Sequence, residues 1–238
     1  MKRNTTILTV CLLAGLATNA AWAADNWQDL FDGKTLNGWV QRGGKAKYAV
    51  EDGCIVGSTV LGTGNSFLCT EKEYANFILE LEFKDDPKLN SGVQIRSLCF
   101  DKDTVPTDKA GEPLKDPKGK VIGKIPAGRV HGYQVEIDPS KRAWSAGIYE
   151  EGRRGWLNDL SKNDAARAAF KQGDWNKYRI ECKGDSIKTW INGVPAADLK
   201  DDVTPKGFIG LQVHGVGKDK DKDSIQVRFR NLRIQVLD

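Results

Sequence analysis

Histidine, cysteine and long apolar runs are scarce in this sequence, and each shortage excludes a class of protein. The 238 residues include 2 His and 5 Cys, and these never fall at the short spacings typical of a zinc site. Beyond the first residues, no stretch approaches the roughly 18 apolar residues of a membrane helix. The formal net charge is only +4, too small and too evenly spread to indicate nucleic acid binding. Neither a metal cofactor nor a nucleic acid partner is therefore expected.

The start of the chain has the three parts of an export signal. Lys2 and Arg3 are followed by an apolar run over residues 7–17 and by the small-x-small sequence of residues 21–23. We expect cleavage after the last of these. Loss of the segment removes two basic residues and no acidic one, which lowers the net charge from +4 to +2. Cys11 lies inside the apolar run, so no lipid anchor is expected, and the product is periplasmic or secreted.

The remaining residues, 24–238, fit one all-β domain. Short runs with period-two alternation recur between turn signals such as Asn192-Gly193, which predicts an antiparallel two-sheet sandwich. The runs are 48–50, 54–56, 66–69, 77–83, 92–96, 132–137, 178–182, 186–191, 208–213 and 225–234. Only residues 163–170, rich in Ala and Arg, indicate a helix.

Four cysteines follow the expected leader: Cys54, Cys69, Cys99 and Cys182. An oxidising compartment permits disulfides, with three connectivities if all four pair. A chain of this length does not need them for a core, so buried free thiols are the alternative.

Residues 97–128 interrupt the regular succession of predicted strands, because they are rich in Asp, Lys, Pro and Gly and show little periodicity. An insertion of this length in a compact domain is usually functional or mobile. Because it joins the two strands with the most polar faces, we expect it to wall or cover a site on that face.

The most informative segment is residues 132–138, Gly-Tyr-Gln-Val-Glu-Ile-Asp. Its apolar residues alternate with Gln134, Glu136 and Asp138, so one face of the predicted strand carries an amide and two carboxylates. Other strands show the same division, and their polar faces carry Gln94 and Arg96, Trp190, and Gln212 and His214. A polar outer face is the simplest explanation for one such strand alone. Together they predict a sheet surface of donors, acceptors and an aromatic ring that binds a polyol such as a sugar.

The same residues suggest chemistry. Glu136, Asp138 and His214 are candidates for proton transfer, and Arg96 is a candidate to hold a developing oxyanion. A structural role for a lone histidine is the alternative for His214. The Glu-x-Asp strand motif of laminarinase and lichenase glycosidases is incomplete here, because Pro139, Ser140 and Lys141 replace its second Glu. Glu150 or Glu151 would have to substitute from elsewhere, and no spacing indicates that.

Ten short motifs follow one another in a fixed order along nearly the whole chain after the leader. They are residues 30–39 (LFDGKTLNGW), 50–53 (VEDG), 77–83 (FILELEF), 90–96 (NSGVQIR), 132–138 (GYQVEID), 147–149 (GIY), 175–176 (WN), 190–193 (WING), 210–214 (GLQVH) and 229–232 (FRNL). Together they resemble the 3-keto-disaccharide hydrolase domain, a family in exported bacterial proteins. The resemblance implies a two-sheet antiparallel jelly-roll sandwich of the concanavalin A-like or laminin G-like kind.

The resemblance implies an enzyme acting on glycosides whose C3 hydroxyl has been oxidised to a ketone. The ketone acidifies the C2 proton, which permits elimination of the C1 substituent and hydration of the enone. Glu136 is then the expected base, Asp138 and His214 its partners in proton transfer, and Arg96 the clamp on the keto oxygen. The expected sugar contacts are Asn90, Gln94, Gln134, Tyr149, Trp190 and Gln212. Many relatives carry Glu-Val-Gln where this chain has Gln134-Val135-Glu136, so the carboxylate lies two residues further along the same face.

A non-catalytic carbohydrate-binding module of the same fold is the rival interpretation. Aromatic platforms would dominate the face of such a module, whereas titratable groups outnumber them here. Calcium is common in this superfold, but no Asp-rich loop of the right pattern marks a site. The sugar, the anomer and the partner proteins are not specified by the sequence.

Overall fold

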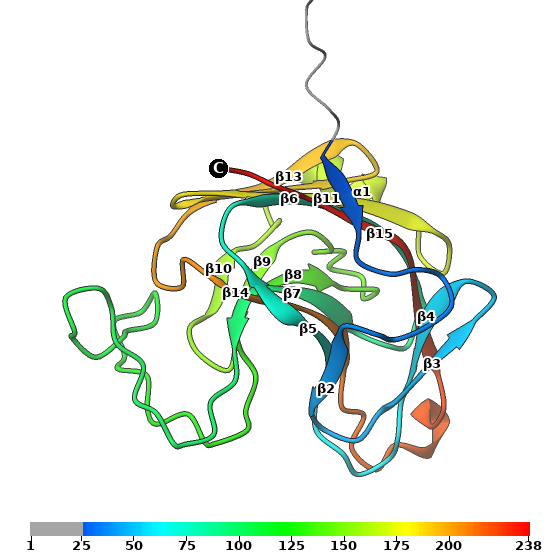
Figure 1. Cartoon of the computed structure of the whole chain (residues 1–238), viewed down its shortest axis with the longest axis horizontal. Helices are drawn as coiled ribbons and strands as arrows, with labels where there is room; N and C mark the ends of the chain where they lie inside the picture. Colours follow the sequence, from blue (N-terminus) through cyan, green and yellow to red (C-terminus); the bar gives the residue numbers. More distant parts are fainter. Residues whose placement is uncertain (1–25) are drawn as a thin grey trace, which may run out of the picture.

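The structure, a computed structural model, describes residues 26–238, so the expected leader and its Cys11 lie outside it. Two antiparallel sheets stack face to face (Figure 1). The back sheet has the order β13 (Val194–Lys200), β12 (Ser186–Ile191), β11 (Asn176–Lys183), β6 (Phe77–Asp85), β15 (Gln226–Val236), β4 (Cys54–Ser58) and β3 (Lys47–Glu51), and β1 (Trp27–Asp29) also pairs with β15. The expected all-β sandwich is confirmed.

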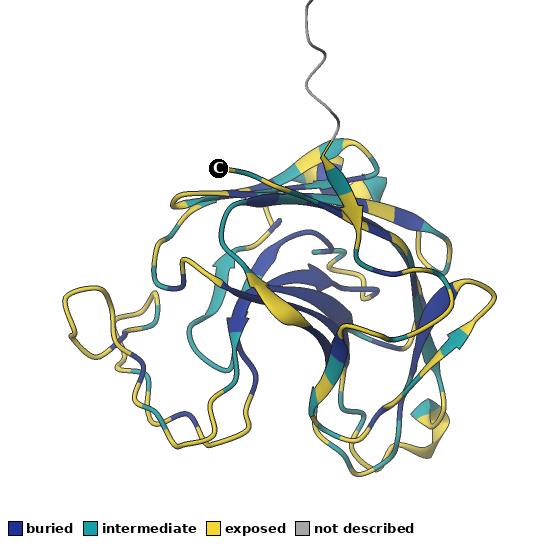
Figure 2. Cartoon of the chain, viewed as in Figure 1, coloured by how far each residue is buried: buried dark blue, intermediate teal, exposed yellow. Residues whose placement is uncertain are grey.

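The front sheet carries the strands of interest for function. Its order is β10 (Gly155–Asn158), β9 (Ile148–Glu151), β8 (His131–Ile137), β7 (Ser91–Leu98), β14 (Gly207–Val213), β5 (Ser66–Tyr74) and β2 (Trp39–Gly43). The polar-faced strands β8, β7 and β14 are therefore direct neighbours at its centre. Most of their residues are buried (Figure 2).

The core lies between the sheets, and period-two alternation explains how it forms. In β6, Phe77, Leu79, Leu81 and Phe83 point inward and are almost fully buried. Inward residues of β8 and β14 pack against the same cluster. Burial of this apolar surface is the main stabilising term of the fold.

One short α-helix and one 3-10 turn complete the regular structure of residues 26–238. Helix α1 (Asp164–Ala169) is capped by the side chain of Asn163, which accepts a hydrogen bond of 3.1 Å from the Ala166 N–H. The helix expected over residues 163–170 is thus confirmed. The 3-10 turn η1 (Lys220–Lys222) lies just before β15. None of the helices in the described part of the chain is long and apolar enough to cross a membrane.

The expected insertion forms two exposed loops, drawn in green in Figure 1 and mostly exposed in Figure 2. Isolated β-bridges connect distant residues of the insertion, among them Thr104 with Ile125 and Lys115 with Val121. Its last residues, Pro126 to Gly128, line a cavity on the front sheet. None of residues 97–128 lines the cavity that contains Gln134 and Glu136, so a role for the insertion at that site stays a prediction.

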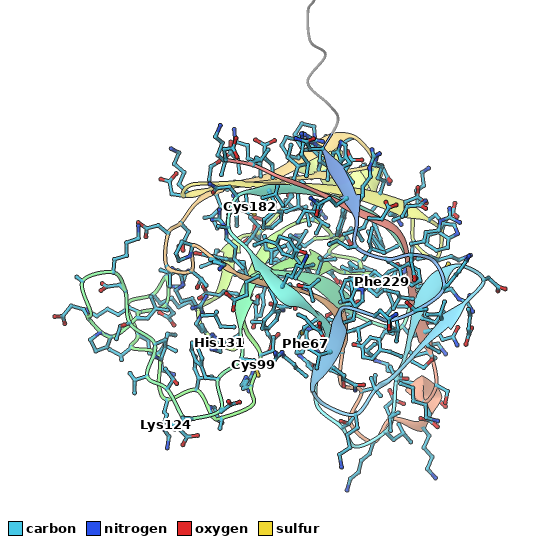
Figure 3. The ribbon with its side chains drawn as sticks, in the orientation of Figure 1. Phe67, Cys99, Lys124, His131, Cys182 and Phe229 are labelled. Carbon is cyan, nitrogen blue, oxygen red and sulfur yellow. The ribbon has the colours of Figure 1, made fainter. Side chains whose placement is uncertain are left out.

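Cys54, Cys69, Cys99 and Cys182 are free thiols, which decides the alternative that the sequence left open. Three are buried, and Cys99 is partly exposed where the insertion leaves β7. Burial raises the pKa of Cys182 to about 12 and raises that of Cys69 further. Cys99 packs against a small apolar cluster that contains Phe67, whereas Cys182 belongs to the main core (Figure 3).

Candidate functional site

The pairing of β7 with β8 and β14 brings the predicted polar residues onto one face of the front sheet. Gln94 pairs with Gln134 of β8 on one side and with Gly210 of β14 on the other, while Gly92 pairs with Glu136. Residues that pair across strands share a face, so Gln94, Gln134 and Glu136 lie side by side. This part of the predicted convergence is confirmed.

A one-way chain of hydrogen bonds runs across this face and ends on Glu136. The Ser97 hydroxyl donates to Gln94 Oε1 (2.7 Å), and Gln94 Nε2 donates to Gln134 Oε1 (2.6 Å). Gln134 Nε2 then donates to Glu136 Oε2 (2.7 Å), and Asn90 Nδ2 donates to Glu136 Oε1 (2.6 Å). Both carboxylate oxygens therefore accept an amide N–H, and the network holds the side chain in one position.

Gly92 makes room for this network. A Cβ atom at Gly92 would lie 2.6 Å from Cγ and Cδ of Gln134, closer than any real contact. The Gln134 side chain thus crosses the neighbouring strand where that strand has no side chain.

Burial raises the pKa of Glu136 to about 7, and the negative charge of Asp138 adds to this rise. The hydrogen bonds from Asn90 and Gln134 and the positive charge of Arg142 oppose it. A carboxylate that changes protonation near neutral pH is suited to accept and return a proton.

Glu136 opens onto a cavity of about 420 Å³, a size that suits a small ligand. The cavity is lined by Asn65, Asn90, Arg129, Gln134, Glu136, Arg142, Tyr149, Glu151, Trp156 and His214. Tyr149 and Trp156 meet edge to face with centroids 5.4 Å apart, and the Arg142 guanidinium lies 5.5 Å from the Trp156 ring centroid. Tyr149, predicted as a sugar contact, therefore lies in the cavity wall. We call this space the first cavity.

Asp138 lies beside the cavity and does not line it. Its carboxylate accepts hydrogen bonds from the Ser140 N–H (3.1 Å), from Arg142 Nε (2.9 Å) and from the Trp144 N–H (3.3 Å). Burial alone would raise the pKa of Asp138, but the hydrogen bonds from Ser140 and Arg142 outweigh it, and the pKa is lowered. The arrangement makes Asp138 the residue that positions Arg142.

His214 lines the first cavity from the end of β14 and is exposed. Its Nδ1 lies 2.8 Å from the Gly215 carbonyl oxygen. Because a carbonyl oxygen only accepts, this contact places a proton on Nδ1 and leaves Nε2 as the ring nitrogen for proton transfer. Glu136 and His214 thus line the same cavity, as predicted.

The prediction for Arg96 is wrong, because a bulge in β7 breaks the alternation. The register shifts between Ile95 and Leu98, and Arg96 has a φ of 45°. Its buried guanidinium donates to the carbonyls of Ala75 (2.7 Å) and Gly184 (2.8 Å). Arg96 joins two turns of the sandwich and does not line the first cavity.

The prediction for Trp190 is wrong for a different reason. Its strand β12 belongs to the back sheet, where Ile187, Thr189 and Ile191 face the core and are buried. Trp190 therefore lies on the outer surface, with the Arg179 guanidinium 5.9 Å from its ring centroid. Alternation identified the face of the strand but not the sheet.

Gln212 faces the same side as Gln94, opposite Phe67 of β5, but does not line the first cavity. It is fully buried, and neither atom of its amide has a hydrogen-bond partner among the described residues.

The sequence assigned no site role to several cavity residues, and it named Glu151 only as an alternative to Glu150 for a second carboxylate. Glu151 is only 8% exposed and accepts weak hydrogen bonds from Asn65 Nδ2 (3.5 Å) and Arg129 Nη2 (3.4 Å). Burial raises its pKa, and the positive charges of Arg129 and His214 partly offset this. Its neighbour Glu150 instead forms buried ion pairs with Arg153 and Arg154.

Comparison with known proteins adds an independent line of information. A model of the family described as 3-keto-alpha-glucoside-1,2-lyase-like domain matches residues 26–235. A 3-keto-disaccharide hydrolase from Bacteroides thetaiotaomicron is 26% identical in an alignment of 258 residues, which covers 90% of this chain and 80% of that protein.

Two solved structures share the fold at lower identity. A candidate glycosyl hydrolase from Parabacteroides distasonis has a TM-score of 0.53 and 22% identity, with 90% of this chain and 95% of that chain covered. Carbohydrate-binding module CBM66 from Bacillus subtilis also has a TM-score of 0.53, with 15% identity and coverage of 83% and 96%. At these identities the two structures establish the architecture alone.

Proposed function

This chain belongs to the family of 3-keto-alpha-glucoside-1,2-lyase-like domains, and we propose that it hydrolyses 3-keto-glycosides by elimination and hydration. The observation that carries the proposal is Glu136: a buried carboxylate with a pKa near 7, fixed by two amide donors, in a cavity of small-ligand size. The family is described as lyase-like and the relative as a hydrolase. Elimination is a lyase reaction, and elimination followed by hydration is hydrolysis overall, so this sequence of steps agrees with both descriptions.

In the first step, the Glu136 carboxylate removes the C2 proton of the 3-keto sugar. The electron pair forms the C1=C2 double bond as the C1–O bond breaks, and the leaving oxygen takes a proton from a second acid, the role proposed for His214. In the second step, water adds its oxygen to C1 and gives a proton back to that second group, while Glu136 returns its proton to C2. The sum is one water consumed and one C1–O bond hydrolysed.

Arg142 takes the place that the sequence assigned to Arg96. It lines the first cavity, and Asp138 holds its Nε at 2.9 Å while the remaining guanidinium N–H groups stay available. A cation at this position stabilises the negative charge that develops on the keto oxygen when C2 loses its proton. His214 supplies a second group for proton transfer in the same cavity.

The test compares wild-type protein with Glu136→Gln on a 3-keto-glucoside and on its unoxidised parent. We expect wild-type protein to release the leaving group only from the keto sugar, and Glu136→Gln to lose about two to four orders of magnitude in rate. Glu181→Gln, on the back sheet, removes an equal charge and serves as the control. Melting temperatures must accompany the rates, because Asn90 and Gln134 both donate to Glu136 and a glutamine leaves one of them unpaired.

Two outcomes would change the proposal. If Glu136→Gln keeps nearly the wild-type rate while a folded His214→Gln is inactive, the base has been misassigned. If wild-type protein binds sugars but releases nothing from the keto sugar, the carbohydrate-binding module becomes the better interpretation. The titratable side chains that line the first cavity favour an enzyme over a non-catalytic carbohydrate-binding module.

Export is part of the same proposal, supported by the leader pattern of residues 1–23. Mass spectrometry of the exported protein should give a chain that begins near Ala24 and carries no acyl group. A retained first residue would overturn it.

A further inference from the structure

A second cavity, of about 300 Å³, lies next to the first and has only basic residues among its charged lining. Lys124 comes from the insertion, and Arg129 and Arg153 flank strands β8 and β9, with Tyr149 and Gly152 between them. Arg129 and Tyr149 also line the first cavity, so the two spaces adjoin at these residues. Within the described part of the chain, three cations and no carboxylate line the second cavity.

Two of the cations are held in place by carboxylates that do not line the cavity. Lys124 Nζ lies 2.7 Å from Asp103, and its side chain is well exposed. Arg153 is almost fully buried, and its Nη2 donates to Glu150 and Thr204, each at 2.7 Å. Lys124 can therefore contact a ligand directly, whereas Arg153 contributes a fixed positive charge behind the lining.

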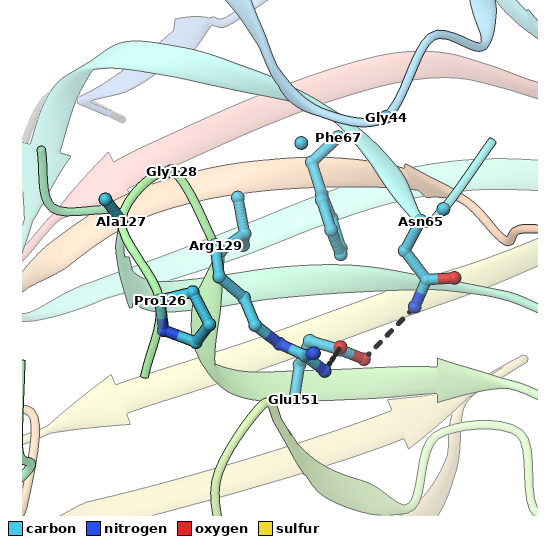
Figure 4. A pocket seen from close by; sticks show the side chains of 11 residues that line it. Gly44, Asn65, Phe67, Pro126, Ala127, Gly128, Arg129 and Glu151 are labelled. Atoms are coloured by element: carbon cyan, nitrogen blue, oxygen red, sulfur yellow. Dashed lines mark hydrogen bonds and ion pairs between the residues drawn. The ribbon is translucent and has the colours of Figure 1, made fainter. Parts of the chain in front are cut away.

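Arg129 is the cation best placed to bind a ligand in this cavity. Its side chain is 53% exposed, and its single hydrogen bond within the described residues, from Nη2 to Glu151, is long at 3.4 Å (Figure 4). A guanidinium carries its N–H donors in a planar fork that matches two oxygens of a carboxylate, sulfate or phosphate. The remaining donors of Arg129 are free to form such a contact.

Gly152 allows the buried ring of His131 to lie beside the same cations. A Cβ atom at Gly152 would lie 3.1 Å from Nε of Arg129 and 3.1 Å from Cβ of His131. Neither ring nitrogen of His131 has a hydrogen-bond partner among the described residues. Burial, followed by the positive charges of Arg153 and Arg129, lowers the pKa of His131 to about 4. The local field is therefore that of an excess of positive charge, which attracts an anion.

We propose that the second cavity binds an oxyanion group, a carboxylate, sulfate or phosphate, with Arg129 and Lys124 as its direct ligands. The hydroxyl of Tyr149 adds a further donor in the same lining. The oxyanion is either a free inorganic ion or an acidic substituent on a sugar held in the first cavity. The inference concerns binding alone, so it stands or falls separately from the proposed reaction.

His131 gives a readout of this site that needs no turnover. The chain contains 2 histidines, so His214→Gln assigns the remaining imidazole signal in an NMR titration to His131. Sulfate is the probe, because its charge stays constant over the range in which His131 titrates. A bound oxyanion favours the imidazolium, and we expect saturating sulfate to raise the pKa of His131 by about one unit relative to chloride at equal ionic strength. An unchanged pKa would overturn the proposal.

Substitution of the lining residues locates the bound ion. By calorimetry, we expect the affinity for sulfate to fall about tenfold in Arg129→Gln and about threefold in Lys124→Ala. Lys109→Ala is the matched control, because Lys109 belongs to the same insertion, forms an equally short and exposed ion pair of 2.7 Å with Asp202, and lines neither cavity. Unchanged affinity in both lining variants, or an equal fall in Lys109→Ala, would overturn the site.

Unoxidised sugars distinguish the two sources of the oxyanion. If the group is a substituent, wild-type protein should bind methyl glucuronide about tenfold more tightly than methyl glucoside, and Lys124→Ala should reduce that preference. Equal affinity for the two sugars, with sulfate still bound, identifies a free ion as the ligand. Because these measurements use no keto sugar, absence of cleavage would refute the proposed reaction without affecting this site.

Discussion

The side-chain amide of Asn65 donates a hydrogen bond of 3.5 Å to the carboxylate of Glu151, although three strands, β8, β7 and β14, separate their positions in the front sheet. Four strand spacings in a flat sheet would place them about 19 Å apart. The front sheet must therefore curve strongly enough for its two sides to meet at the first cavity, which both residues line. Asn65 Oδ1 also accepts a hydrogen bond of 2.9 Å from the Gly215 N–H, which ties the segment after His214 to the same junction.

The rate of cleavage should depend on the protonation of Glu136. Its pKa is raised to about 7, and a base acts only when it is unprotonated. We expect kcat/KM to rise about tenfold per pH unit below 7 and to level off above it. A profile that is flat from pH 5 to 8 would show that Glu136 is not the base.

Asp85→Asn should stabilise the protein at neutral and alkaline pH. Asp85 is buried without a hydrogen-bond partner on either carboxylate oxygen among the described residues, and burial raises its pKa to about 7 from an ordinary value of 3.8. A raised folded-state pKa means that the wild-type protein loses stability as pH rises from about 4 to 7. Asparagine does not titrate, so the advantage of the variant should be small near pH 4 and grow to at most about 4 kcal/mol above pH 7.

Denaturant unfolding at pH 4.5 and pH 8 measures this difference. Asp86→Asn, a neighbouring carboxylate whose Oδ1 accepts from the Lys88 N–H, is the control. An Asp85→Asn variant less stable than wild type at pH 8 would mean that the carboxylate has a partner, such as an ion, that the structure does not contain.

Gly92→Ala should impair the site more than it impairs the fold. The methyl group would displace Gln134, which then no longer donates to Glu136. Loss of this donor raises the pKa of Glu136, so the acidic limb of the pH profile should move upward and the rate at pH 7 should fall about tenfold or more. Gly57→Ala creates a comparable clash, 2.4 Å from Val213 in the core, and should lower the melting temperature without moving the pH profile.

The two tryptophans should behave oppositely on substitution. Trp156 lines the first cavity, and Trp190 lies on the outer surface of the back sheet. We expect Trp156→Ala to raise KM about tenfold through loss of a sugar contact, and Trp190→Ala to leave KM unchanged. A rise in KM for Trp190→Ala alone would mean that sugars bind on the opposite face of the protein.

Local periodicity predicts much of this fold, because each strand reports which side chains share a face. Gln94, Gln134, Glu136 and His214 were placed correctly by that argument. It failed for Arg96, where a bulge adds a residue that no sequence pattern marks. It failed for Trp190, because alternation does not state which sheet a strand joins.

Three cavity residues without an assigned role in the sequence share one physical cause. Asn65, Arg129 and Arg142 lie outside the regular strands, and only the curvature of the front sheet and the path of the loops bring them to Glu136 and Glu151. These are relationships between distant segments. The loop residues show no periodic pattern, so a single sequence contains no local signal for these contacts.

The free thiols make the protein easy to label. Cys54, Cys69 and Cys182 are buried, and deprotonation to the reactive thiolate is disfavoured for Cys69 and Cys182 because their pKa values are raised. Within residues 26–238 only Cys99 is partly exposed, and it packs against the cluster of Phe67 and Val130, which line a cavity on the front sheet. A maleimide fluorophore should therefore attach at one position in the folded protein. Its emission would report on the entry of a ligand into that cavity.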